Sequence, residues 1–104
     1  MLIKELKERL EVTGLPVAYS HFADQTDPPF IAYLLPESRN IVADDSVYQA
    51  KMLVQVELYT NIRDLELEKK VEQQLTDVIW KKITEYIESE AMFETIYEME
   101  VMTE

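Results

Sequence analysis

The chain has 104 residues, 47% of them hydrophobic, which suffices for one domain with a single core but not for two. The 21 acidic and 10 basic residues give a formal net charge of −11, which disfavours direct binding to nucleic acid because it repels the phosphate backbone. The absence of cysteine excludes disulfides, thiol nucleophiles and cysteine zinc sites, and a single glycine argues against a Gly-rich phosphate loop. We therefore expect one globular domain over residues 1–104.

The first predicted element is a helix over residues 2–12. Ile3, Leu6 and Leu10 recur at helical spacing, with charged residues around the remaining surface. Gly14 follows and can end the helix, because glycine takes the left-handed cap conformation without a steric penalty. The mixed charged and apolar start is unlike a signal peptide or a membrane span, so we expect a protein of a reducing cytoplasm with no membrane partner.

Two strands are predicted next. Residues 17–22 favour a short strand, and residues 23–29, which include paired prolines, cannot continue it. Residues 30–35 are almost wholly apolar, which predicts a central strand covered on both faces.

Residues 36–50 are interpreted as a long hairpin arm. Residues 36–40 turn the chain, and apolar residues follow on both sides of an acidic corner. Because this segment is more apolar than a free loop requires, we expect it to contact another molecule. The candidate contact residues of the arm are Arg39, Ile41, Val42, Asp44, Asp45, Val47 and Tyr48.

The run 51–87 predicts a strand that leads into a long helix. Apolar and polar residues alternate over 51–60, which is the pattern of a half-buried strand. Asn61 and Asp64 are candidate N-caps of the helix. A helical stripe then repeats every four residues, formed by Leu67, Val71, Leu75, Ile79, Ile83 and Ile87.

The last segment, residues 93–102, returns to the alternation of a strand. Its polar face is nearly all glutamate, as expected of an edge strand that must avoid stray pairing, and it defines a candidate acidic surface of Glu94, Glu98 and Glu100. The predicted fold is α+β, in the order α-β-β-β-α-β. A mostly antiparallel four-stranded sheet carries two helices on one face, and a long hairpin arm lies between its second and third strands.

No pattern indicates an enzyme. His21 is the only histidine, and Ser20 beside it would face the opposite way in a strand. The acidic segments 24–27 and 44–46 lack the ligand spacing of a calcium loop and are interpreted as turns. We find no phosphate loop, hydrolase motif or zinc signature, so we expect neither catalysis nor a cofactor or metal.

The order of these pieces resembles a family of phage proteins. The tract PFIAYLLPESRN…ADDSVYQAKMLVQVELYT…DLELEKKVEQQL is similar to small proteins from the structural genes of long-tailed bacteriophages and prophages of Gram-positive bacteria. The most specific part is a strand ending in VELYT that leads into a helix starting at DLELEKK. The family is that of the tail terminators, also called tail-completion or head–tail joining proteins. It has helices against a β-sheet and no catalytic residues to transfer to this chain.

This resemblance implies a structural role in virion assembly. Subunits would form a homo-oligomeric ring, usually a hexamer, at the head-proximal end of the tail tube, where the ring ends tail growth and joins the tail to the head. The implied partners are further copies of the chain, the tail tube protein and the head connector or stopper. The implied location is the host cytoplasm during assembly and then the head–tail junction. A stopper or adaptor role in the same neck remains an alternative.

Two interpretations from other classes also remain open. The acidic charge and the glutamate row suit a monomeric inhibitor that imitates DNA and binds a basic protein. Such binding would weaken steeply with salt, whereas apolar ring contacts would not. A small enzyme would rest on His21 and nearby acids alone.

Overall fold

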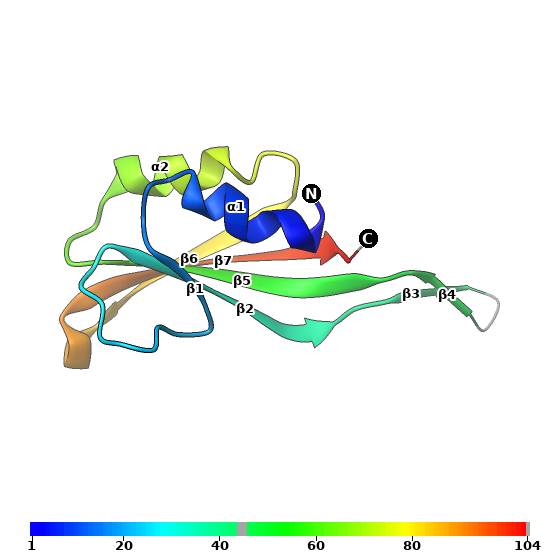
Figure 1. Ribbon diagram of the computed structural model, residues 1–104, viewed down its shortest axis with the longest axis horizontal. Helices are drawn as coiled ribbons and strands as arrows, with labels where there is room; N and C mark the ends of the chain where they lie inside the picture. The colour runs from blue at the N-terminus through cyan, green and yellow to red at the C-terminus, as the bar shows by residue number, and fades with distance from the viewer. Residues whose placement is uncertain (44–45, 104) are drawn as a thin grey trace.

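The computed structural model describes residues 1–43 and 46–103, with the side chains of residues 1–40 and 50–103. It has an α+β fold in which the helices lie on one face of a single mixed five-stranded sheet (Figure 1). A separate two-stranded hairpin extends beyond one end of that sheet. The molecule is correspondingly elongated, with extents of 50 × 26 × 24 Å.

The sheet order is not the order of the chain. The strands lie as β1-β2-β5-β7-β6; β1 and β2 are parallel, and the other neighbours are antiparallel. Strands β3 and β4 pair only with each other. In chain order the elements are η1 (Ile3–Glu5), α1 (Leu6–Glu11), β1 (Val17–Tyr19), β2 (Phe30–Ser38), β3 (Ile41–Ala43), β4 (Ser46–Gln49), β5 (Lys51–Thr60), α2 (Leu65–Gln73), β6 (Trp80–Ile87), η2 (Glu88–Glu90) and β7 (Met92–Met102).

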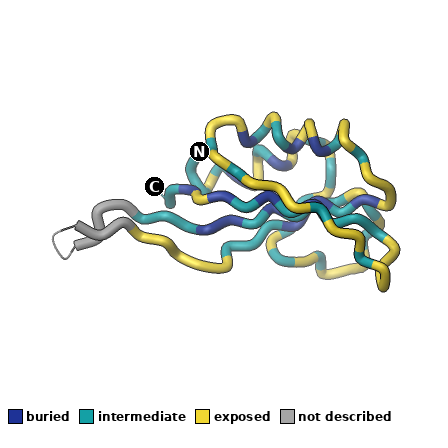
Figure 2. Tube along the Cα trace, turned by 180° about the vertical axis from the view of Figure 1, so that it is seen from behind, coloured by how far each residue is buried: buried dark blue, intermediate teal, exposed yellow. Residues whose placement is uncertain are grey.

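The core lies between the helices and the central strands (Figure 2). The alternation predicted for 51–60 and 93–102 is confirmed, because every second residue of β5 and β7 faces the helices. Fully burying one such side chain stabilises the fold by about 1.5–3 kcal/mol. The buried cluster comprises Leu6, Leu10, Ile31, Val54, Val56, Leu58, Val71, Leu75, Tyr97, Met99 and Val101.

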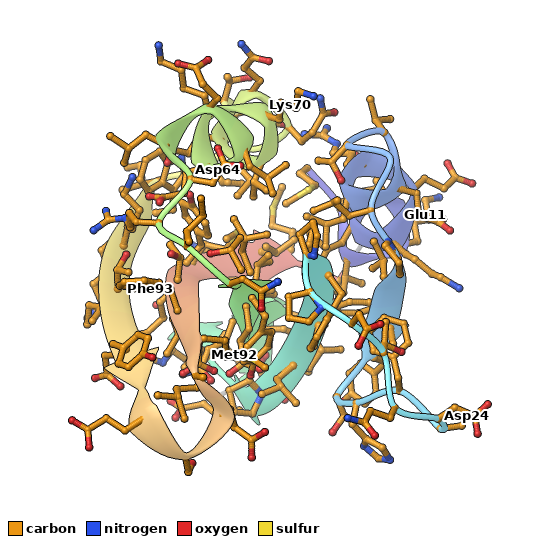
Figure 3. All side chains as sticks on the ribbon, turned by 90° about the vertical axis from the view of Figure 1, so that its left-hand side faces the viewer. Glu11, Asp24, Asp64, Lys70, Met92 and Phe93 are labelled. Atoms are coloured by element: carbon orange, nitrogen blue, oxygen red, sulfur yellow. The ribbon has the colours of Figure 1, made fainter. Side chains whose placement is uncertain are left out.

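The predicted helix boundaries are confirmed at two places. The first helical segment ends near Gly14, whose φ of 84° is the left-handed conformation expected of a glycine cap. Asp64 is the N-cap of α2 and accepts a hydrogen bond from the backbone N–H of Leu67 at 3.0 Å (Figure 3). Both helices cover the same face of the sheet, as predicted (Figure 1).

The prediction of one long helix up to residue 87 is wrong. Helix α2 ends at Gln73, and the chain continues as strand β6. A spacing of four is also a multiple of the strand period of two, so Ile79, Ile83 and Ile87 share a face in either structure. The segment is rich in β-branched and aromatic residues, which favour a strand.

The sheet therefore has five strands rather than the predicted four. Strand β6 pairs with the outer side of β7. Strand β7 is therefore an inner strand, and the prediction that it forms an edge is wrong. The sheet is also mixed, because the connection 20–29 returns the chain to the starting end of β1 and β2 then runs in the same direction. The observed order is α-β-β-β-β-β-α-β-β, counting the two arm strands.

The boundaries of the first two strands also differ from prediction. Strand β1 ends at Tyr19 instead of residue 22, because Ser20 has a positive φ of 65° that breaks the extended chain. Strand β2 continues to Ser38 instead of turning at Pro36, and a register shift between Leu34 and Glu37 accommodates the proline. Burial on both faces is limited to the adjacent residues Ile31 and Ala32, so the cover predicted for residues 30–35 is present only near the start of β2.

A charged cluster holds α2 against the sheet. Glu68 is 2% exposed and forms ion pairs with Arg63 at 2.8 Å and Lys82 of β6 at 3.0 Å. Lys82 also pairs with Glu72 at 2.8 Å, and Glu72 accepts a hydrogen bond from the Tyr97 hydroxyl at 2.7 Å. Burial opposes ionisation of Glu68, but the hydrogen bonds from Arg63 and Lys82 together outweigh it and lower the pKa of this carboxyl.

We predict that Glu68→Gln lowers the free energy of unfolding by about 2 kcal/mol at pH 7, because it leaves two cations without their shared carboxylate. Because the pKa of Glu68 is lower in the folded state than in the unfolded state, its ionised carboxyl stabilises the fold at pH values above the unfolded-state pKa. This stabilisation is lost as the pH falls through the folded-state pKa. Urea unfolding should therefore show the wild type and the variant converging at acidic pH. Glu66→Gln, on the exposed side of α2, is the matched control and should cost about 0.5 kcal/mol. If the difference in free energy of unfolding between wild type and Glu68→Gln stayed the same at acidic pH, the stabilisation could not come from the ionised Glu68 carboxyl.

Candidate functional site

The predicted arm is a β-hairpin that extends from the end of the sheet. Strands β3 and β4 pair antiparallel, and Figure 1 shows them projecting past the body of the molecule in line with β2 and β5. The backbones of Ile41, Val42, Val47 and Tyr48 lie in this hairpin. Asp44 and Asp45 lie outside the described residues. An isolated two-stranded hairpin is only marginally stable in water, so its geometry fits an element that binds a partner.

Arg39 fixes the base of the arm to the sheet. Its backbone N–H donates to the carbonyl of Lys51 at 2.8 Å. Its guanidinium pairs with Glu37 at 2.7 Å and with Glu100 of β7 at 3.1 Å. The hydrogen bonds to Glu37 and then Glu100 raise the pKa of Arg39. Arg39 therefore contacts its own chain on both sides of the arm.

The predicted acidic residues lie together on the face of the sheet opposite the helices, which we call the open face. Glu94, Glu98 and Glu100 share this side of β7, because the alternate residues of that strand face the core. Two of them form ion pairs within their own chain. Glu98 pairs with Lys81 at 3.6 Å. Glu100 pairs with Arg39 at 3.1 Å, so the acidic row is partly neutralised by its own molecule.

A fourth carboxylate, Glu57 of β5, joins the acidic row at one end. The Tyr59 hydroxyl donates to Glu94 at 2.6 Å and lies 3.2 Å from Glu57, so one hydroxyl lies between two carboxylates. Burial first, and then the charge of Glu94, raise the pKa of Glu57. The sequence pattern could not reveal this group, because Tyr59 and Glu94 are 35 residues apart.

We predict that Glu57→Gln raises the free energy of unfolding at pH 7 by about 0.5–1 kcal/mol, because it removes a like-charge contact across two strands. A raised folded-state pKa means that the stabilising contribution of Glu57 is present at acidic pH and is lost as the pH rises through that pKa. The gain should therefore disappear near pH 4, as measured by urea unfolding. Glu90→Gln removes an exposed charge in η2 and should leave stability nearly unchanged. A Glu57→Gln variant that is less stable than wild type at pH 7 would show that the contact between Glu57 and Glu94 is not destabilising.

His21 lies outside the sheet, in the connection between β1 and β2. Its Nδ1 lies 3.3 Å from the Ser20 hydroxyl, so the two side chains meet, and the expectation that they face opposite ways is wrong. The positive φ of Ser20 ends the strand alternation on which that expectation depended. Both residues line a pocket of about 320 Å³ that also includes Asp24 and Tyr59. No hydrogen bond from His21 to a carboxylate is found in the described part of the chain.

Neither a metal centre nor a membrane span is found among residues 1–43 and 46–103. Within those ranges, no three side chains of histidine, aspartate or glutamate gather as ligands for one metal ion. None of the helices described there has the length and apolar character needed to cross a bilayer.

Strand β6 is a surface feature that the sequence analysis missed. Ile79, Ile83 and Tyr86 are 94%, 53% and 51% exposed, although most large apolar side chains of the fold are covered. A groove of about 650 Å³ borders the start of this strand and is lined by Trp80 and Lys81 among others. The isoleucines recur every four residues in the sequence, a spacing that fits a helix as well as a strand.

The comparisons with known proteins support a likeness of fold. No protein-family model matches the chain, and no curated protein matches it. Among solved structures, it is similar to a chain of the virion of a native gene transfer agent (GTA) particle, with a TM-score of 0.54. The two chains share 10% sequence identity, and the match covers 93% of this chain and 91% of the other. The whole domain thus shares its fold with a virion component.

Proposed function

We propose that this protein is a structural component of a phage-like virion that forms a ring at the head-proximal end of the tail tube. The observation that carries this proposal is the fold shared with a chain of the GTA virion over nearly the full length of both chains. The resemblance to tail terminators in the tract around VELYT and DLELEKK narrows the proposed role to ending tail growth and joining the tail to the head. The proposed partners are further copies, the tail tube protein and the head connector.

The arm provides a means of assembly. A closed ring needs a head-to-tail contact in which one surface of a subunit meets a different surface of the next. A projecting hairpin is suited to such a contact, because it reaches past the body of its own subunit (Figure 1). In the proposed ring, the arm of each subunit lies against its neighbour or the tube and gains the packing that an isolated hairpin lacks.

The paired state of the acidic row argues against the DNA-mimic alternative. A mimic presents negative charges that a basic protein can neutralise, whereas two of the three row residues, Glu98 and Glu100, already form ion pairs with Lys81 and Arg39 of their own chain. Screening by salt also limits what such exposed charges contribute. Absence of catalysis remains part of the proposal, because His21 has a serine beside it but no orienting acid among the described residues.

We predict that replacing residues 40–50 with an Asn-Gly turn leaves the domain folded and abolishes capping of tail tubes. Arg39 and Lys51 already form a hydrogen-bonded pair, so a two-residue turn can join them directly. The assay measures the length of growing tail tubes by electron microscopy, with and without each protein. Wild type should stop elongation and leave a ring at one tube end.

The control for this assay is Ile62→Ser, which removes an exposed apolar side chain just beyond the end of β5 that lies away from the arm. It should cap tubes like the wild type. Tubes that keep growing in the presence of folded wild-type protein would refute the proposed function. Capping by the arm-less variant would refute the role of the arm and leave the ring proposal standing.

A further inference from the structure

Strand β6 has an outer edge without a neighbouring strand in the described part of the chain. It pairs with β7 over its whole length without a register shift and contains no proline, so its outward backbone groups form a regular row. Natural edge strands are commonly protected by bulges, prolines, short length or charged side chains. Strand β6 has no bulge or proline, and its charges are of both signs, Lys81 and Lys82 against Glu85, so they do not exclude a second copy of the same strand. Figure 3 shows it as the outermost ribbon beside Phe93. Such an edge is suited to receive another strand.

We propose that β6 pairs antiparallel with the β6 of a second copy of this chain, around a two-fold axis at Ile83. The two sheets then form one continuous sheet. On the open face, Ile83 lies opposite the partner's Ile83, and Lys81 lies opposite the partner's Glu85. Ile79, the residue just before β6, would then lie near the partner's Ile87, the last residue of the strand. The strand is thus complementary to itself in both charge and apolar character.

The charges of each separate chain favour this pairing. Within one chain, Glu85 lies directly opposite Glu94 of β7, which is a destabilising like-charge pair. Lys81 is 69% exposed and lies 3.6 Å from Glu98. Across the seam, the order of side chains becomes Glu98, Lys81, the partner's Glu85 and the partner's Glu94. Each lysine then lies between two glutamates, and each Glu85 gains an opposite charge.

Apolar side chains continue across the same seam on both faces. Ile83 pairs with Ile96 of β7, so four isoleucines would form a row through the axis on the open face. On the helix face, Trp80 would lie opposite the partner's Tyr86. Trp80 already packs edge-on against Tyr97 at 5.3 Å, and Tyr86 is half exposed. The second copy therefore covers the apolar side chains that β6 leaves exposed.

Other registers of the same two strands are less favourable. Along β6, the backbone N–H and C=O groups of alternate residues point away from β7 and toward it. A shift of one residue would place residues whose groups point outward opposite partner residues whose groups point toward the partner's β7, so the hydrogen bonds between the two strands would be lost. A shift of two residues places Lys82 opposite the partner's Lys82 in one direction. In the other direction it places Ile83 opposite the partner's Glu85. The register centred on Ile83 avoids both conflicts.

This two-fold contact differs from the head-to-tail contact of a ring, and it does not rest on the proposed function. It concerns the free protein in solution, without tail tubes. Its failure would leave the ring proposal untouched, and failure of tube capping would leave the dimer untouched.

The test is charge exchange at the seam, followed by sedimentation equilibrium over a range of concentrations. Lys81→Glu and Glu85→Lys should each raise the dimer dissociation constant about tenfold or more, because each creates two like-charge pairs. The double variant Lys81→Glu/Glu85→Lys should restore the wild-type constant. Lys7→Glu on α1 makes the same charge change away from β6 and should have no effect.

The decisive result is a mixture of the Lys81→Glu and Glu85→Lys single variants. In a mixed pair, position 81 of each chain carries the charge opposite to that at position 85 of the other. The mixture should therefore form a heterodimer at concentrations where each variant alone is mostly monomeric. Circular dichroism of each variant before mixing verifies that it is folded. A wild type that stays monomeric at all concentrations overturns the proposal. Single variants that associate like wild type, or a mixture of folded variants that forms no heterodimer, would also overturn it.

Discussion

The antiparallel pairing of β5 with β7 is the constraint on which the rest of the structure depends. Its register is unbroken from Lys51 opposite Met102 to Thr60 opposite Phe93. Because side chains alternate along both strands, one face of this pair is nearly continuous apolar surface, and α1 and α2 cover it. A shift of one residue would turn that surface to solvent, so core burial fixes the register. Strands β2 and β6 then add to the two outer sides of the pair.

The remaining surfaces follow from this arrangement. Since both helices lie on one side, the acidic row lies on the other side of the sheet, part of which is covered by the connection 20–29. The row is tolerated because Lys81 and Arg39 reach it from a neighbouring strand and from the base of the arm. Strands β2 and β5 extend past the rest of the sheet, where Arg39 pairs with Lys51. The hairpin begins at the end of this extension and projects beyond the body of the molecule. The ion pair between Arg39 and Glu100 thus joins the base of the arm to the acidic row.

The sequence was informative where one local pattern decided the structure. Alternation identified β5 and β7, and Asp64 and Gly14 marked helix ends through capping chemistry that a few neighbouring residues determine. It failed at β6, because isoleucines four residues apart fit a helix and a strand equally well. The partners of the acidic row could not be predicted either, since Arg39 and Glu100 are 61 residues apart and meet only through the sheet order.

The central claim is that this fold serves at the head–tail junction of a virion. The most direct measurement is immunogold electron microscopy of intact particles, with antibody raised against the purified chain. The account predicts one cluster of gold at the point where the tail meets the head, and none along the tail. Labelling distributed along the tube or over the head, or purified particles that carry none of the chain, would contradict it.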